Sequence, residues 1–167
     1  MSDHEAPALA GVHHLKLPVT DLRRSQRWYE SRLGYRVSVE FQRDGELDGI
    51  GMVHPNGGPG LGLRLDPERA RASAGFEYFA IGVPDESALR ALEDRLTGLG
   101  EQHAGVQPAT FGWILPLLHD PDGHEVRFYT VQHHTEPDPE NVLVVDNPVE
   151  AARRKAAARA DAMGSGR

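Results

Sequence analysis

One order of residues occurs twice in this chain, and this repetition limits the possible folds more than any other feature of the sequence. Each half has a strand-like segment, then an aspartate, then a segment of helical periodicity, then a Leu-Gly pair. Aspartate is preferred at helix N-termini, and glycine commonly ends helices. The corresponding positions are Val19 and Val83, Asp21 and Asp85, each 64 residues apart, and Leu33-Gly34 and Leu99-Gly100. We interpret the pattern as a duplicated unit, the alternative being chance similarity between two αβ segments.

Strand-like runs, separated by turn residues, follow each predicted helix. The first helix is expected over 22–33, and the second ends at Leu99. The runs that follow are 35–41, 49–54 and 61–65 in the first half, and about 103–107, 111–119 and 124–130 in the second. Each half therefore reads as β-α-β-β-β, and residues 66–74 form a polar link rich in Ala and Arg.

These elements predict one domain with a tail before it and an extension after it. The domain covers 11–134 and contains the two βαβββ units, at about 11–65 and 75–131. The tail is 1–10. The extension, 135–167, is expected to be a loose arm followed by a helix that starts at Asn147-Pro148 and runs to about Met163.

Composition restricts the classes of function. The formal net charge is −7, and no Lys/Arg cluster with interleaved aromatic residues occurs in the domain, so nucleic acid is not an expected partner. The absence of cysteine excludes disulfides, thiolate metal ligands and cysteine nucleophiles. Apolar runs such as 113–118 are too short to cross a membrane, and the first residues lack the features of a secretory signal. We therefore expect a cytoplasmic protein without a membrane partner.

Two motifs resemble those of the vicinal-oxygen-chelate superfamily, which includes glyoxalases, bleomycin-resistance proteins and dioxygenases. They are HHLKLPVTDLRRSQRWYESRLGY at 13–35 and HDPDGHEVRFYT at 119–130. The resemblance covers roughly 11–131. It implies an α+β, glyoxalase-like fold in which two tandem βαβββ units form a curved mixed sheet around a cavity, here with a C-terminal arm and helix added. In that family the cavity usually holds a divalent metal.

The resemblance implies one metal ligand, His14, at the family's first ligand position. The second ligand position holds Tyr78, and a neutral phenol is a poor ligand compared with imidazole. The last position holds Arg127, which is always cationic and cannot chelate, and a further position holds Arg64. We therefore expect no cofactor, with a divalent metal held by relocated ligands as the alternative. The candidates for relocated ligands are His54, His119 and Glu125.

The same substitutions give the expected cavity a basic lining that can form hydrogen bonds. The residues predicted to bind a ligand are Lys16, Arg64, Glu125, Tyr129 and Trp113. In an enzyme, His14 would be the general acid or base, Tyr78 a hydrogen-bond donor, and Arg127 the group that holds developing negative charge. Arg127 could instead pair with a carboxylate such as Glu125.

Three functions are consistent with this lining. The first is a binding protein that sequesters an anionic or polyoxygenated small molecule without a metal. The second is a metal-independent isomerase, lyase or cyclase, and the third is a metal-dependent dioxygenase or lyase. We favour the first. Besides the small molecule, a second copy of the chain is an expected partner, because relatives often form homodimers and the VLVV segment at 142–145 could dock on another subunit.

Overall fold

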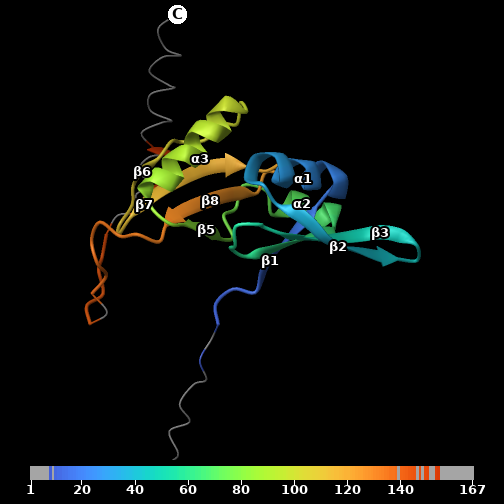
Figure 1. The fold of residues 1–167 in the computed structure, drawn as a ribbon, viewed down its shortest axis with the longest axis horizontal. Coiled ribbons are helices and arrows are strands. Elements are labelled where there is room, and N and C mark those ends of the chain that lie inside the picture. The colour runs from blue at the N-terminus through green and yellow to red at the C-terminus, as the bar shows by residue number, and fades with distance from the viewer. Residues whose placement is uncertain are drawn as a thin grey trace, which may run out of the picture. The chain divides into compact units, whose positions relative to one another are not determined.

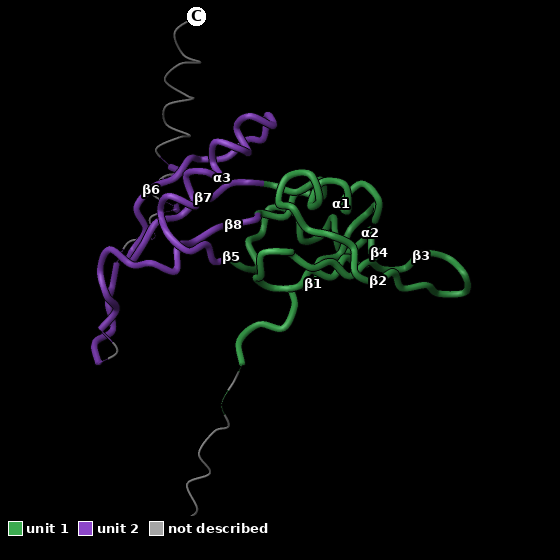
Figure 2. The backbone as a smooth tube through the Cα atoms, in the orientation of Figure 1, with its two compact units in different colours: residues 1–81, 119–125 green, residues 82–118, 126–167 purple. Residues whose placement is uncertain are grey.

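The computed structural model describes residues 8, 10–138, 140–145, 147, 149–150 and 153–154. The chain folds into two compact units (Figure 2). The first contains the described residues up to Ile81 together with His119–Glu125, and the second contains Gly82–Leu118 and the described residues from Val126 onward. Most of the helix predicted from Asn147 lies outside the described residues. None of the described helices is both long and apolar enough to cross a membrane.

The first unit is a four-stranded sheet with helices (Figure 1). Its elements are β1 (His14–Val19), α1 (Leu22–Trp28), a π-helical turn (Tyr29–Leu33), β2 (Arg36–Arg43), β3 (Glu46–Val53), β4 (Gly60–Leu65) and α2 (Pro67–Ala72). The strand order is β1-β4-β3-β2, in which β1 is parallel to β4 and the other neighbours are antiparallel. The sheet is therefore mixed, as the predicted fold class requires.

Local sequence signals explain the boundaries of the first helix and hairpin. The Asp21 carboxylate accepts a hydrogen bond from the Arg24 backbone N–H at 2.9 Å, which caps α1 as predicted. Gly34 ends the helical segment with φ of 81°, a conformation that glycine adopts without steric cost. Asp44 and Gly45 both have positive φ, 54° and 86°, which is typical of the tight turn between β2 and β3.

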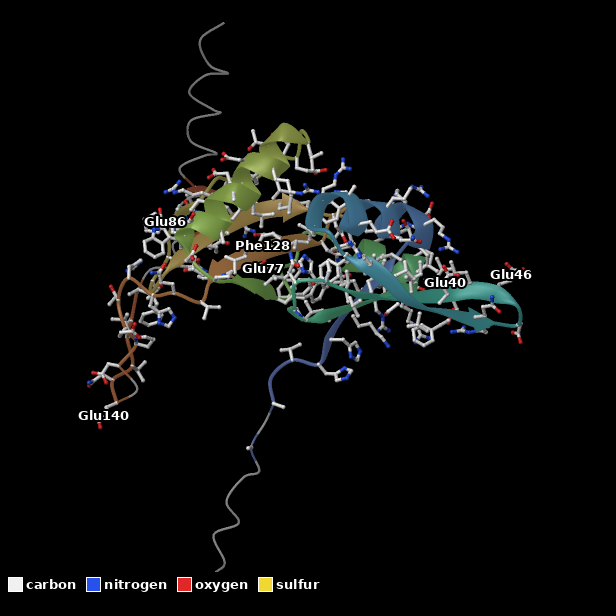
Figure 3. All side chains as sticks on the ribbon, viewed as in Figure 1. Glu40, Glu46, Glu77, Glu86, Phe128 and Glu140 are labelled. Carbon is white, nitrogen blue, oxygen red and sulfur yellow. The ribbon has the colours of Figure 1, made fainter. Side chains whose placement is uncertain are left out.

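One face of the first sheet forms the core beneath α1, which contacts β3 and β4. The most buried side chains of the sheet and of the helical segment are Leu17, Val19, Ile50, Met52, Leu61, Leu63 and Tyr29. Each large side chain of this kind stabilises the fold by about 1.5–3 kcal/mol when fully buried. Glu40, labelled on β2 in Figure 3, accepts hydrogen bonds from Arg23 of α1 at 2.6 and 3.2 Å. The opposite face of this sheet points away from α1 and its core.

The second sheet repeats the strand order of the first. Its elements are β5 (Ala80–Val83), α3 (Glu86–Gly98), β6 (Gln107–Pro108), β7 (Trp113–His119) and β8 (Glu125–Thr130). The order β5-β8-β7-β6 corresponds to β1-β4-β3-β2, and Asp85 caps α3 as Asp21 caps α1. The duplication predicted from the 64-residue repeat is confirmed, with the strands in two four-stranded sheets.

The structure differs from the sequence-based prediction in the link at 66–74. This segment contains helix α2, because Asp66 accepts a hydrogen bond from the Arg69 N–H at 3.1 Å and Pro67 occupies the first turn. The segment Asp66-Pro67-Glu68 is a typical helix start, which the sequence-based prediction did not use. Tyr78 also differs, since it precedes β5 instead of lying within that strand.

Candidate functional site

The face of the first sheet that points away from α1 is built largely on glycine. Residues paired across neighbouring strands project to the same side of a sheet. Gly62 of β4 is paired with Lys16 of β1 and with Gly51 of β3, and Arg64 is paired with Gly49. The Lys16 and Arg64 side chains therefore share this face, which we call the glycine face, with three residues that have no side chain.

Side chains from the outer strands lean over these glycines. A Cβ atom on Gly62 would lie 3.7 Å from Cε of Lys16 and 3.8 Å from Cδ2 of His14. A Cβ atom on Gly51 would lie 2.5 Å from Cγ1 of Val39, which is closer than real Cβ contacts. Glycine at these positions therefore permits the close approach of His14 and Lys16 from one side and of Val39 from the other.

A cavity of about 440 Å³ lies at the basic end of the glycine face and is lined by Lys16, Pro18, Arg64, Asp66 and Arg69. Asp66 lies 3.6 Å from Nε of Arg69 and partly compensates that cation. No ion pair within the described part of the chain involves Lys16 or Arg64. Sequence reasoning missed Arg69, and the cap of α2 was the signal that would have placed it.

The other end of the same face is apolar. Val39, Phe41 and Val53 have exposed fractions of 42%, 55% and 49%, which is high for large apolar side chains. Isolated exposed apolar residues are ordinary, but a group on one face marks a surface suited to a ligand or partner. The glycine face thus offers cations at one end and apolar contact at the other.

The residues around His14 do not fit a divalent metal. Nδ1 of His14 lies 3.0 Å from Nδ1 of His13, and the nearby Lys16 is a cation that repels a metal ion. Within the described ranges, no group of three or more His, Asp or Glu side chains is placed to hold a metal. His54, a candidate for a relocated ligand, uses both ring nitrogens, at 2.9 Å from the Leu33 carbonyl and 3.2 Å from the Asn56 N–H.

The remaining predicted residues of the first unit lie elsewhere. The Tyr78 hydroxyl donates to the Ser73 carbonyl at 3.4 Å, and its ring stands edge-on to His124 at 5.7 Å. Glu125 is fully buried, and its backbone N–H donates to the Phe76 carbonyl at 3.2 Å. His119, the other candidate for a relocated ligand, is exposed at the end of β7.

In the second unit, Arg127 and Tyr129 occupy alternate positions of β8. Burial raises the pKa of Tyr129, and the nearby Arg127 cation opposes that rise. Trp113 is half-buried and packs edge-on against His134, with ring centroids 5.0 Å apart. The structure thus groups His14, Lys16 and Arg64 in one unit, and Arg127 and Tyr129 in the other.

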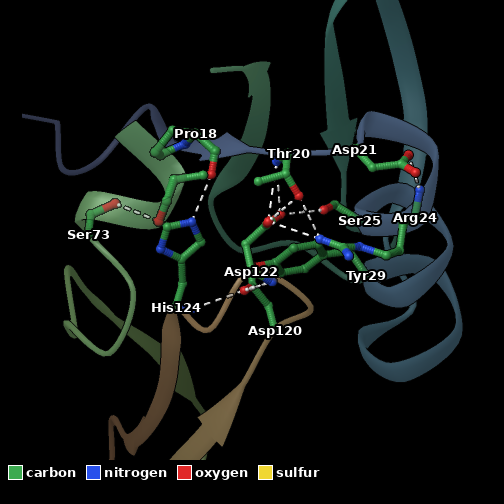
Figure 4. Close-up of polar contacts among 11 residues, drawn as sticks. Pro18, Thr20, Asp21, Arg24, Ser25, Tyr29, Ser73, Asp120, Asp122 and His124 are labelled. Atoms are coloured by element: carbon green, nitrogen blue, oxygen red, sulfur yellow. Dashed lines mark hydrogen bonds and ion pairs between the residues drawn. The ribbon is translucent and has the colours of Figure 1, made fainter. Parts of the chain in front are cut away.

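The turn after β7 holds the first unit together through Asp122 (Figure 4). Asp122 accepts hydrogen bonds from the Thr20 hydroxyl at 2.6 Å and from the Thr20 backbone N–H at 3.2 Å. It also accepts from Arg24 at 2.9 Å and from the Ser25 hydroxyl at 3.3 Å, although its side chain is only 3% exposed. Asp122 therefore ties the end of β1 to the start of α1.

A second buried contact of the same turn involves Asp120. The Tyr29 hydroxyl donates to Asp120 at 2.9 Å, and the backbone N–H groups of Asp122 and His124 donate to its other oxygen at 3.0 Å. His124 in turn reaches the Pro18 carbonyl through Nε2 at 2.7 Å. Sequence reasoning used this turn only as a family motif, whereas its polar side chains hold in place the strand that carries His14 and Lys16.

Replacing Asp120 with asparagine should remove a contribution to stability that decreases as pH rises. Burial raises the pKa of Asp120 above 3.8, and the nearby His124 and the hydrogen bonds only partly oppose the rise. The folded state therefore holds this proton more tightly than the unfolded state, and the ionised carboxylate penalises the fold as pH increases. The stability of the wild type minus that of Asp120→Asn, from urea unfolding, should fall as pH rises past about 3.8.

The matched control for that experiment is Asp138→Asn. Hydrogen bonds from Asn141 and the Glu140 N–H hold the pKa of Asp138 below 3.8, so its difference curve should rise over the same acidic range. Parallel curves for the two variants would contradict the assignment of a raised pKa to Asp120.

Comparison with known proteins gives one family. The model of the Glyoxalase/Bleomycin resistance protein/Dioxygenase superfamily matches residues 11–128. A search of curated proteins found no match to the chain.

Solved structures give the same fold. A glyoxylase/bleomycin resistance protein/dioxygenase domain from Frankia sp. EAN1pec is 28% identical, with a TM-score of 0.61, covering 74% of this chain and 98% of that one. A lactoylglutathione lyase from Agrobacterium tumefaciens is 16% identical, with a TM-score of 0.60, covering 75% and 96%. TnmS3, an antibiotic binding protein from Streptomyces sp. CB03234, is 16% identical, with a TM-score of 0.59, covering 75% and 98%.

Proposed function

The chain belongs to the Glyoxalase/Bleomycin resistance protein/Dioxygenase superfamily, and we propose that within it the chain is a binding protein without a catalytic metal. Its ligand is an anionic or polyoxygenated small molecule, held on the glycine face. The observation that carries this proposal is the cavity of about 440 Å³ whose lining has three cations, Lys16, Arg64 and Arg69, against one carboxylate, Asp66, which pairs with Arg69.

The chemistry of this face selects the class of ligand. A guanidinium such as Arg64 can form two parallel hydrogen bonds to a carboxylate or phosphate, and Lys16 adds a compact positive charge. Val39, Phe41 and Val53 provide apolar contact on the same face. A ligand with an apolar body and one acidic or oxygen-rich group satisfies both ends, in the manner of small-molecule sites generally.

Sequestration has further support from one structural neighbour. TnmS3 is an antibiotic binding protein and shares the fold of this chain. A binding function requires no metal and no acid/base pair, which agrees with the cationic surroundings of His14. Retention of an intact ligand is therefore the role that we propose.

Removing the two cations should abolish most of the binding. We expect the double variant K16M/R64M to bind the anionic aromatic probe 1-anilinonaphthalene-8-sulfonate at least about tenfold more weakly than the wild type. A charge-assisted contact contributes about 1.5–3 kcal/mol, and the exposure of both side chains reduces this, so about 1.4 kcal/mol or more is expected for the pair. Fluorescence titration measures the dissociation constant, and added chelator should leave it unchanged.

The matched control is R43M/R90M, which removes the same number of charges from exposed ion pairs with Asp48 and Glu86. Binding by this variant should stay within about twofold of the wild type. Equal weakening of both double variants, or a dependence of the affinity on added metal, would overturn the proposal.

A second candidate function rests on the contact between His13 and His14. Two exposed imidazoles with nitrogens 3.0 Å apart can exchange a proton, and His14 lies on the same face as Lys16. A metal-independent isomerase, lyase or cyclase would use His14 as acid or base. Mass spectrometry of a metabolite extract incubated with the protein distinguishes the two functions. Compounds converted by the wild type but not by His14→Ala would favour the enzyme.

A further inference from the structure

The second unit contains a cavity of about 390 Å³ that is separate in its residues from the glycine face. Its walls include Phe111, Tyr129, Thr130, His133, Leu143 and Val145. Cavities of this size fall within the range that holds small organic molecules. None of its lining residues is Asp, Glu, Lys or Arg, so its chemistry differs from that of the basic cavity described above.

One wall of this cavity belongs to a part of the chain outside the family match. The match ends at residue 128, whereas His133, Leu143 and Val145 follow it. The wall therefore lies outside the part of the chain that the family model matches.

The arm at 142–145 presents alternate side chains to the cavity. Val142 and Val144 have exposed fractions of 93% and 89%, whereas Leu143 and Val145 have 58% and 53%. This alternation matches an extended segment with one side toward the cavity and the other toward solvent. Leu143 and Val145 still expose half of their surface, which a ligand in the cavity would cover.

The chain beyond the arm is packed against the second unit. Val149 is only 2% exposed and forms a small apolar cluster with Ala109 and Ile114, against which Tyr129 packs. The cluster thus fixes the chain four residues beyond Val145. The cavity wall is consequently part of the folded unit.

The polar groups of the cavity suit a neutral ligand. The Thr130 hydroxyl is already engaged, since it accepts from the Trp113 N–H at 3.0 Å and donates to the Gln132 carbonyl at 2.7 Å. The Tyr129 hydroxyl makes no hydrogen bond among the described residues. Burial raises the pKa of Tyr129, so at neutral pH its hydroxyl keeps its proton and can donate it.

Aromatic rings complete the lining. Phe111 and His133 stand side by side with ring centroids 6.0 Å apart, and the Tyr129 ring lines the same cavity. Aromatic rings prefer offset or edge-on contact with other rings, which adds to the free energy of apolar burial. Leu143 and Val145 supply aliphatic contact on the remaining side.

We propose that this cavity is a second binding site, which takes a small neutral aromatic molecule carrying one hydroxyl or carbonyl oxygen. The rings of Phe111 and His133 contact the aromatic body, the Tyr129 hydroxyl bonds to the oxygen, and the arm at 142–145 covers the ligand. The site uses residues of the second unit alone.

Isothermal titration with 2-naphthol tests the site, with variants of the arm made in the full chain. The double variant L143N/V145N should weaken binding at least tenfold, because it replaces the apolar wall with amides. The matched control V142N/V144N changes the outward side chains of the same segment and should stay within twofold of the wild type. No binding by the wild type, or equal weakening by the two double variants, would overturn the proposal.

A third variant tests the hydrogen bond. Tyr129→Phe should weaken 2-naphthol about fivefold, as expected for one lost hydrogen bond, and should leave naphthalene within twofold. Equal effects on both compounds would refute the role of the hydroxyl. K16M/R64M should bind 2-naphthol as the wild type does, so the failure of the anionic site and the failure of this one are distinguishable.

Discussion

Replacing Asp122 with alanine is expected to lower the free energy of unfolding by about 3–5 kcal/mol, as found when one member of a buried, hydrogen-bonded charged group is removed. The carboxylate accepts from the Thr20 backbone and hydroxyl, from Ser25 and from Arg24, and is almost fully buried. Its loss leaves the Thr20 N–H and the Ser25 hydroxyl without their acceptor, and each such group costs about 1–3 kcal/mol. Arg24 contributes little to this total, because it is 44% exposed.

Urea unfolding of the full chain, followed by circular dichroism, measures this loss. Asp48→Ala is the matched control, since Asp48 makes an ion pair with Arg43 at 2.8 Å near the surface. Removal of an exposed pair costs about 0–1 kcal/mol. A loss for Asp122→Ala no greater than that of Asp48→Ala would show that the turn does not hold β1 to α1.

The substitution Gly112→Ala should destabilise the second unit by about 3 kcal/mol, at the upper end of the usual cost of overpacking. A Cβ atom on Gly112 would overlap the Thr130 hydroxyl and lie 2.8 Å from the Gln132 carbonyl oxygen. The Thr130 side chain cannot turn aside without losing its bonds to the Trp113 N–H and the Gln132 carbonyl. Steric overlap and the loss of these hydrogen bonds therefore both destabilise the variant.

Thermal unfolding of Gly98→Ala provides the comparison. Gly98 ends α3, and apart from its chain neighbours and the backbone of its own helix, no atom lies within 4 Å of the position that its Cβ would take. Alanine there should stabilise the protein by about 0.5 kcal/mol through helix propensity and a less flexible unfolded chain. If Gly112→Ala were as stable as Gly98→Ala or more stable, the claim that Gly112 is too closely packed to carry a side chain would be contradicted.

The sequence predicted the repeated architecture because its signals are local. Asp21 and Asp85 cap helices through their own neighbours, and Gly34 adopts positive φ whatever lies around it. The alternation of Leu15, Leu17 and Val19 similarly depends only on the two-residue period of a strand.

The candidate site was harder to predict from the sequence, because it depends on strand register and on contacts between residues that are far apart in the chain. The common face of Lys16 and Arg64 follows from the pairing of β1 with β4, which no local pattern specifies. Arg69 reached the cavity through a helix whose Asp66 cap was overlooked. Tyr78 was aligned to a strand position by the repeat, yet β5 begins two residues after it.

The turn at 119–125 has a consequence for the order of events during synthesis. Its bonds join Thr20 to Asp122 across 102 positions of the chain, and Tyr29 to Asp120 across 91. Contacts between residues so far apart in sequence form slowly, because a long loop must close before they are made. When only the residues of the first sheet have left the ribosome, Asp120 and Asp122, which complete the polar contacts of that unit, have not yet been synthesised. The unit that begins the chain is therefore completed only after residues 82–118 of the other unit have been synthesised.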